Sequence, residues 1–208
     1  MEKTNYDEAF IKTVGSLSGK PRLLLHACCA PCSSSVLERV TPFFDVTLYF
    51  FNPNITDSYE YEKRLFELNR FVGLAYGGLI PVIDGGFSPE LFFGAAKGKE
   101  NEPEGGARCS ACYAQRLSAT AEYAAKNGFD YFCTTLSVSP YKNADKLNAI
   151  GVLAGERAGV RYLVSDFKKR QGYVRSIELS KEYGLYRQNY CGCLYSQAQA
   201  EKSRSIRR

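Results

Sequence analysis

Short apolar runs alternate along this chain with segments of helical periodicity. Each run is four to nine residues long and is rich in aliphatic, β-branched or aromatic residues, which is typical of buried strands. The clearest is RLLLHA, and DVTLYFF and DYFCTTLSV follow the same pattern. We predict strands at residues 22–27, 45–51, 79–84, 130–138 and 160–166.

The segments between these runs have apolar residues at helical spacing. The stretch SSSVLERV, 33–40, predicts a helix capped by a serine, and 57–73 predicts one closed by Gly73. Further helices are predicted at 113–128 and at 143–159, although Gly151 weakens the second. Two more are predicted at 176–184 and 194–205.

Alternation of strands and helices predicts the α/β class, with a mainly parallel sheet flanked by helices in a Rossmann-like, three-layer arrangement. We expect one α/β domain over residues 1–208, with a basic C-terminal helical tail. In such sheets ligands bind at the carboxyl ends of the strands, so we expect a metal site at that edge. The glycine pairs at 85–86 and 105–106 form neither GxGxxG nor a P-loop, so ATP and NAD sites are not predicted.

Composition limits the compartment and the chemistry. Hydrophobic residues make up 45% of the 208, as in globular proteins, and the charged N-terminus lacks the apolar core of a leader peptide. No apolar run approaches the ~18–20 residues that span a bilayer, so we expect no membrane partner and a cytoplasmic location. Thiols stay reduced there, so eight cysteines indicate metal or redox chemistry rather than structural disulfides.

The net charge of +5 is unevenly distributed. The segment from Phe167 to the C-terminus carries ten basic residues against three acidic ones. A basic face suits a polyanion such as RNA, but a solvated helix surface gives the same pattern. The ten are Lys168, Lys169, Arg170, Arg175, Lys181, Arg187, Lys202, Arg204, Arg207 and Arg208.

Seven of the eight cysteines fall in three clusters next to predicted elements, and Cys133 lies inside a predicted strand as a core thiol. Three interpretations remain open: an iron–sulfur cluster with a second metal or redox site, a structural zinc site, and a thioredoxin-like dithiol. Four cluster ligands plus three others would use every clustered thiol. The clusters are Cys28, Cys29 and Cys32; Cys109 and Cys112; and Cys191 and Cys193.

Other polar residues follow the predicted strands. His26, the only histidine, is either a proton donor near the thiols or a satisfied strand residue. Asn52 and Asn54 are substrate contacts or turn formers. The candidates for contacts with an RNA substrate are Lys142, Asn143, Lys168, Lys169 and Arg170. Tyr186, Tyr190 and Tyr195 are candidates for base stacking, with packing the expected role of at least two.

Five stretches with these cysteines resemble the QueH-type epoxyqueuosine reductases, over about residues 22–197. They are LLLHACCAPCSSSV, LYFFNPNI with YEKR, RCSACYAQRLSATAEYA, TTLSVSPYKN, and SDFKKRQGYVRSIELSKEYGLYRQNYCGCLYS. The resemblance implies an oxidoreductase of tRNA queuosine biosynthesis. Its reaction is cobalamin-independent, two-electron removal of the epoxide oxygen from epoxyqueuosine at the wobble position of tRNA. It also implies an external low-potential electron donor.

The resemblance further implies a [4Fe–4S] cluster and a separate mononuclear metal, iron. It places the cluster on Cys28, Cys29, Cys109 and Cys112. Cys191 and Cys193 are then metal ligands or a redox-active disulfide, and catalytic together with Cys32. Cys32 departs from the family, some of whose members have aspartate there. A zinc-stabilised RNA-binding module and a thiol–disulfide oxidoreductase are the alternative functions.

Overall fold

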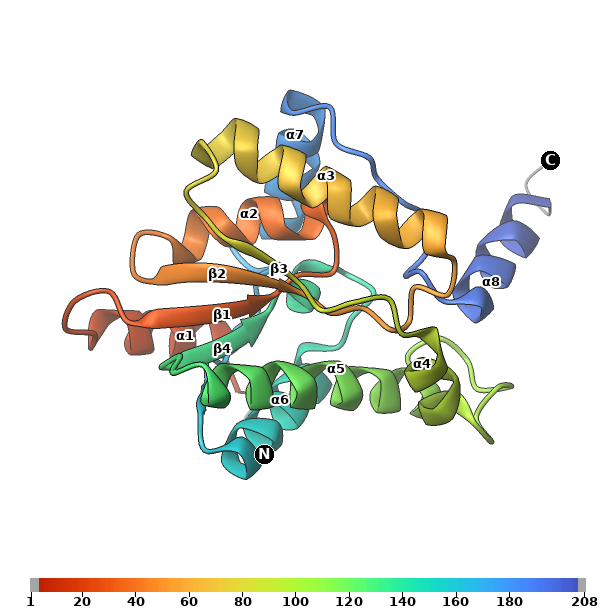
Figure 1. The fold of residues 1–208 in the computed structure, drawn as a ribbon, viewed down its shortest axis with the longest axis horizontal. Helices are drawn as coiled ribbons and strands as arrows, with labels where there is room; N and C mark the ends of the chain where they lie inside the picture. The colour runs from red at the N-terminus through yellow and green to blue at the C-terminus, as the bar shows by residue number, and fades with distance from the viewer. Residues whose placement is uncertain (1–3, 206–208) are drawn as a thin grey trace.

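The computed structural model describes residues 4–205 and contains a five-stranded, entirely parallel sheet of order β3-β2-β1-β4-β5 (Figure 1). Its strands are β1 (Arg22–His26), β2 (Asp45–Phe50), β3 (Val82–Asp84), β4 (Tyr131–Thr134) and β5 (Arg161–Tyr162). The predicted α/β class is confirmed. The chain winds outward from β1 through β2 to β3 and then returns to place β4 on the other side of β1.

Helices cover both faces of the sheet, which gives the three layers of helix, sheet and helix. On one side lie α2 (Ala30–Val40), α3 (Ser58–Tyr76) and α7 (Gly172–Glu182), and α5 (Ala107–Lys126) and α6 (Ala144–Ala158) lie on the other (Figure 1). The remaining helices are α1 (Tyr6–Gly15), α4 (Pro89–Ala96), a 3₁₀ turn at Thr135–Val138, and α8 (Leu194–Ser205). No helix of the described segment is long and apolar enough to cross a membrane.

Side-chain alternation along β1 divides the core between the two layers. Leu23 and Leu25 pack into the cluster under α2 and α3, whereas Leu24 packs into the cluster under α5 and α6. Because alternate residues share a face, His26 points to the same side as Leu24, toward α5. The strand therefore delivers the only histidine of the chain beneath the helix that carries Cys109 and Cys112.

The helix after β1 begins earlier than predicted. It starts at Ala30 with Pro31 in its first turn, and Cys29 precedes it in extended conformation, so the prediction of a serine cap is wrong. Proline suits a first helical turn because its φ is already helical and its missing N–H is not needed there. This shift places Cys32 inside the helix and brings the thiol of Cys29 to its N-terminus.

Other boundaries also differ. Gly73 does not close α3, which continues to Tyr76 and ends at Gly77. The strand predicted at 130–138 ends at Thr134, where Thr134 Oγ1 accepts a hydrogen bond from Leu136 N and the 3₁₀ turn begins. The CxxC lies within the first turns of α5 rather than before a helix at 113. Helices α1 and α4 were not predicted.

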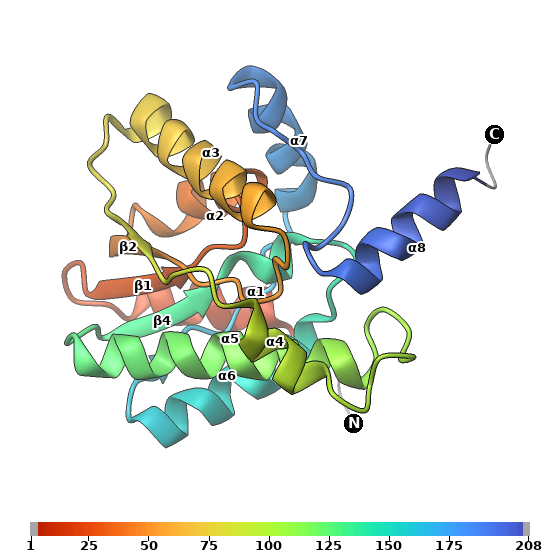
Figure 2. The same ribbon diagram turned by 45° about the vertical axis from the view of Figure 1, so that its right-hand side comes forward.

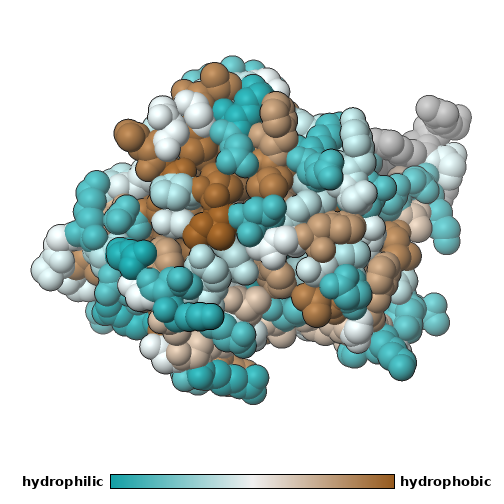
Figure 3. All heavy atoms as spheres, viewed as in Figure 1, coloured by the Kyte–Doolittle hydropathy of each residue, from teal (hydrophilic) through white to brown (hydrophobic). Residues whose placement is uncertain are grey.

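The C-terminal segment forms a helix that extends away from the other layers (Figure 2). This helix, α8, begins directly after Cys193. Arg204 lies on α8, and Arg207 and Arg208 fall outside the described residues. Figure 3 shows apolar side chains gathered over α3, where Tyr59, Phe66 and Leu74 are exposed; such residues are common on protein surfaces.

Gly151 interrupts the helical pattern of α6 for a packing reason. A Cβ atom at this position would lie 2.4 Å from the ring of Tyr162, which packs edge-on against Phe132 with a centroid separation of 5.1 Å. We predict that Gly151→Ala lowers the free energy of unfolding by about 1–3 kcal/mol, because the ring must move. Urea denaturation under reducing conditions measures the change.

Gly73→Ala is the matched control, because this helical glycine has open space around its Cβ position. Helix propensity alone should raise stability there by roughly 0.5–1 kcal/mol. A Gly151→Ala protein as stable as Gly73→Ala would contradict the packing explanation.

Candidate metal and substrate site

Three segments that are distant in sequence bring their cysteines to the carboxyl edge of the sheet. Cys28, Cys29 and Cys32 follow β1, the CxxC lies in the first turns of α5, and the CxC precedes α8. This edge is also where the sheet changes its direction of winding, between β1 and β4. Ligand sites of parallel α/β folds occur at such a point.

The first group is the tightest. The Sγ atoms of Cys28, Cys29 and Cys32 all lie within 4.8 Å of one another, and those of Cys28 and Cys29 are 3.7 Å apart. All eight cysteines are free, and Cys29 is buried. Three thiols this close, at the N-terminus of a helix, are compatible with a soft metal ion or an iron–sulfur centre.

The second pair is held by a turn that requires glycine. Cys191 and Cys193 have Sγ atoms 3.5 Å apart, and Gly192 between them has φ of 112°, where an added Cβ would lie 2.8 Å from Ile55. Asn54 Nδ2 donates to the Cys191 carbonyl at 2.9 Å, and Arg64 Nη1 donates to it at 3.2 Å. The turn is therefore fixed from the β2–α3 side, and Asn54 has a structural role there.

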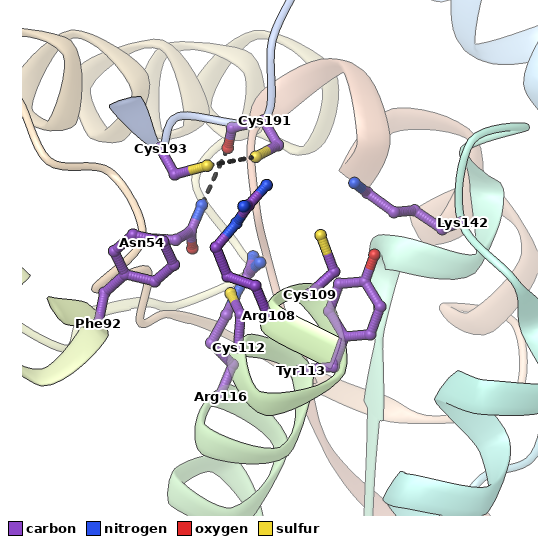
Figure 4. A pocket seen from close by; sticks show the side chains of 10 residues that line it. All are labelled: Asn54, Phe92, Arg108, Cys109, Cys112, Tyr113, Arg116, Lys142, Cys191 and Cys193. Atoms are coloured by element: carbon purple, nitrogen blue, oxygen red, sulfur yellow. Dashed lines mark hydrogen bonds between the residues drawn. The ribbon is translucent and has the colours of Figure 1, made fainter. Parts of the chain in front are cut away.

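The CxxC and CxC thiols share one small cavity of about 20 Å³ (Figure 4). A larger open cavity of about 970 Å³ adjoins it and reaches Cys28, Cys29 and Cys32. Cys191, Arg116 and Lys142 line both cavities, and the two cavities together are lined by all seven clustered cysteines. The donor set fits a metal centre, because thiolates are the preferred ligands of soft metals and iron–sulfur clusters.

Each close thiol pair favours one thiolate. The hydrogen bond from Cys29 holds the pKa of Cys28 well below its usual value, while the pKa of Cys29 rises to about 12. The hydrogen bond between Cys191 and Cys193 likewise lowers the pKa of Cys191 and raises that of Cys193. Each pair thus offers one thiol that ionises easily, as a ligand or nucleophile, next to one that stays protonated.

Lys142 places a cation in the wall that the two cavities share. Its side chain is 10% exposed and forms an ion pair with Glu104 at 3.3 Å. Burial acts to lower the pKa of Lys142, but the charges of Cys191, Tyr113 and Glu104 outweigh it and raise the pKa. The ammonium group therefore stays protonated.

His26 belongs to a buried polar network. Its Nδ1 lies 2.9 Å from Thr134 Oγ1, and Arg116 Nε donates to its Nε2 at 3.3 Å. Burial, together with the charge of Arg116, lowers the pKa of His26 to about 3, so the ring is neutral. These contacts favour a satisfied strand residue over a proton donor.

The remaining candidates separate by their surroundings. Asn143 Oδ1 accepts from Lys146 N and caps α6. Lys168 is paired with Asp166 at 2.7 Å, and Arg170 with Asp7 at 2.7 Å, so both cations have carboxylate partners. Lys169 is exposed and is in none of the ion pairs of the described residues. Cys133 is buried in β4, away from the site, with its thiol donating to the Leu163 carbonyl.

Sequence reasoning missed two buried arginines of the site, Arg64 and Arg116. Arg116 follows Cys112 by four residues, one turn of α5, and this spacing was a usable signal. Arg64 is two per cent exposed and reaches Tyr190 and the CxC turn from α3. Nothing local marks such a contact, because the partners are more than 120 residues apart.

Comparison with known proteins identifies the family. The family model described as "Epoxyqueuosine reductase QueH" matches residues 23–199. The chain is 41% identical to the epoxyqueuosine reductase QueH of Streptococcus pyogenes, covering 94% of this chain and 79% of that protein. It is 42% identical to that of Haemophilus influenzae, covering 89% and 76%. It is 37% identical to that of Thermotoga maritima, covering 84% and 89%. The chain therefore belongs to the QueH family of epoxyqueuosine reductases.

Proposed function

We propose that this protein reduces epoxyqueuosine to queuosine at the wobble position of tRNA. Family membership over most of the chain supports the activity, and the observation that carries the chemistry is the gathering of seven cysteines around two neighbouring cavities. Removing the epoxide oxygen consumes two electrons and two protons: both carbon–oxygen bonds break, a carbon–carbon double bond forms, and the oxygen leaves as water. An external low-potential donor supplies the electrons.

The thiols are proposed to hold a [4Fe–4S] cluster on Cys28, Cys29, Cys109 and Cys112. Cys28 and Cys109 pack against the same apolar group, formed by Tyr113 with Leu136 and Leu147, which supports a shared centre. Cys32, Cys191 and Cys193 remain for a separate iron, or the last two form a redox disulfide. When bound, the cluster supplies electrons one at a time and the iron acts as a Lewis acid.

The chain's own residues position the substrate and hold protons. Lys142 carries a proton at Nζ at the boundary of both cavities, within reach of a substrate bound at the thiols. The larger cavity is lined by Tyr141, Tyr173 and Tyr190, and its volume suits a nucleoside taken out of its stack. Tyr190 is thus the stacking candidate.

Two of the three tyrosines considered for stacking have packing contacts instead. Tyr186 donates a hydrogen bond to Glu60, and the ammonium group of Lys63 lies 3.7 Å from the centroid of its ring in a cation–π contact. The guanidinium carbon of Arg108 lies 4.4 Å from the centroid of the Tyr195 ring, and the Phe92 ring lies 6.2 Å from it, centroid to centroid.

Anaerobic purification tests the cofactor. We predict a brown protein containing iron and sulfide, and we predict that Cys109→Ser and Cys112→Ser lose the cluster and epoxyqueuosine reduction together. Iron and sulfide quantification with an assay on epoxyqueuosine-containing tRNA measures both. A colourless protein with stoichiometric zinc would instead favour the RNA-binding module, and metal-free protein that exchanges disulfides would favour the oxidoreductase.

Cys133→Ser is the control for these variants, because the Cys133 thiol lies in the β4 core rather than at the site. Its iron content should stay close to that of the unmodified protein. Equal loss of iron in all three variants would contradict the ligand assignment.

Lys169 is the clearest candidate for a tRNA backbone contact, because it is exposed while its neighbours Lys168 and Arg170 are paired. We predict that Lys169→Ala weakens tRNA binding at low salt, matters less at high salt, and lowers the slope of log K against log salt by about one. Lys126→Ala, at the far end of α5, should change neither. An unchanged slope for Lys169→Ala would remove it from the interface.

A further inference from the structure

Arg116 is a buried cation directly beneath the thiols. It lies one helical turn after Cys112 on α5, is three per cent exposed, and lines both cavities (Figure 4). Its guanidinium reaches toward Cys112 on one side and toward the end of β1 on the other. Among the arginines of residues 4–205, it is the one that lines both the cavity of the CxxC and CxC thiols and the cavity of the Cys28 group.

The hydrogen-bond partners of Arg116 are neutral. Nη2 donates to Asn52 Oδ1 at 2.6 Å and Nε donates to His26 Nε2 at 3.3 Å. The other contacts of the His26 ring are also to neutral groups, with Nδ1 2.9 Å from Thr134 Oγ1 and Nε2 3.1 Å from the Phe51 carbonyl oxygen. Within residues 4–205, no carboxylate forms an ion pair with Arg116.

Two other buried arginines lie near the site. Arg64 forms an ion pair with Glu60 at 2.6 Å. Arg108 donates to the neutral carbonyls of Lys99, Glu100 and Glu102, and its guanidinium lies over the ring of Tyr195. Arg108 lines the smaller cavity alone, whereas Arg116 lines both cavities and is therefore next to all three cysteine groups.

A buried guanidinium without an anion is costly, because neutral hydrogen-bond partners replace its lost hydration only in part. The groups around Arg116 that can become anions are the thiols of the two cavities that it lines, Cys112 in the smaller and Cys28 in the larger. Four thiolates on a divalent metal, or on a [4Fe–4S]²⁺ core, leave a net charge of about −2 on the assembly. The negative charge of such a centre and the positive charge of Arg116 would offset each other.

We propose that Arg116 is the counter-charge of the thiolate site, and that Asn52 and His26 are positioning residues that direct its guanidinium toward the cysteines. The identity of the bound centre rests on the proposed function; the counter-charge does not. A fixed positive charge beside the thiolates favours formation of a negatively charged metal complex. It also favours the more negative, reduced state of a cluster, and so raises the reduction potential.

The first experiment titrates zinc into the metal-free, reduced full-length protein. Arg116→Met should bind zinc roughly tenfold or more weakly than the unmodified protein, and Arg116→Lys should recover most of the affinity because it keeps the charge. Arg39→Met, at the opposite end of α2 and paired with Asp7, is the control and should leave zinc affinity unchanged.

The second experiment leaves Arg116 in place and neutralises it. Asn52→Asp keeps an acceptor for Arg116, adds a negative charge against the guanidinium and loses the hydrogen bond to the Ala27 carbonyl. Asn52→Ala loses the hydrogen bonds to both Arg116 and the Ala27 carbonyl without adding charge. Asn52→Asp should weaken zinc binding more than Asn52→Ala. A contact that only stabilises the fold predicts the reverse order, because a carboxylate bonds a guanidinium more strongly than no partner does.

The third measurement is the midpoint potential of the anaerobically purified protein. Arg116→Met and Asn52→Asp should move it to more negative values than Asn52→Ala does, and a tenfold change in the reduction equilibrium corresponds to about 59 mV for a one-electron couple. If Arg116→Met does not fold, as judged by thermal melting, the Asn52 pair and Arg116→Lys carry the comparison.

Zinc affinity unchanged in folded Arg116→Met, or lowered equally in Arg39→Met, would overturn the proposal. Asn52→Asp binding zinc as well as Asn52→Ala would also overturn it. A finding that the unmodified protein contains no iron would contradict the proposed cluster, but the zinc titrations would still test the role of Arg116.

Discussion

The parallel sheet, with its change of winding between β1 and β4, is the constraint on which the rest of this structure depends. Parallel strands place every strand's carboxyl end on one edge, and the change of winding keeps the loops after β1 and β4 from being covered by the same crossover. Cys28 and Thr135 meet there, with Thr135 Oγ1 donating to the Cys28 thiol at 3.5 Å. The other cysteine segments are brought to this edge by the N-termini of α5 and α8.

At this edge of the sheet, thiols that can become negatively charged lie beside the positively charged side chains of Arg116 and Lys142. Thiolates alone would repel one another, and arginines alone would be costly to bury. The arrangement stabilises both, because the cations of Arg116 and Lys142 line the cavities that the thiols surround. The balance of charges therefore suits the metal–thiolate centre that we propose for this family member.

Much of this arrangement could be predicted from the sequence. Strand–helix alternation gave the class, and clustering of cysteines beside strand and helix ends gave the edge where they meet. Strand lengths were overpredicted, because apolar residues such as Leu136 and Val138 remain buried after the ladder ends, in a 3₁₀ turn. The helix α1 was missed although Phe10 and Val14 have helical spacing behind the Asn5 cap.

The contacts that could not be predicted are those between distant segments. The sequence around Asn54 predicts a turn residue, but its side chain donates a hydrogen bond to the Cys191 carbonyl, 137 positions away. The pKa of His26 is lowered first by its burial and then by the charge of Arg116, which is 90 positions away in the sequence. Periodicity reveals which face a side chain points to, but it does not reveal what the opposing element supplies there.

Cys109, Cys112 and Arg116 stand on consecutive turns of one helix, α5. Backbone hydrogen bonds make this helix a stiff body, so the two thiols and the positive group beside them keep their spacing when the rest of the chain fluctuates. A redox centre of the proposed kind, held on such a helix, would need little rearrangement of its surroundings when an electron arrives, and its reorganisation energy would be correspondingly small.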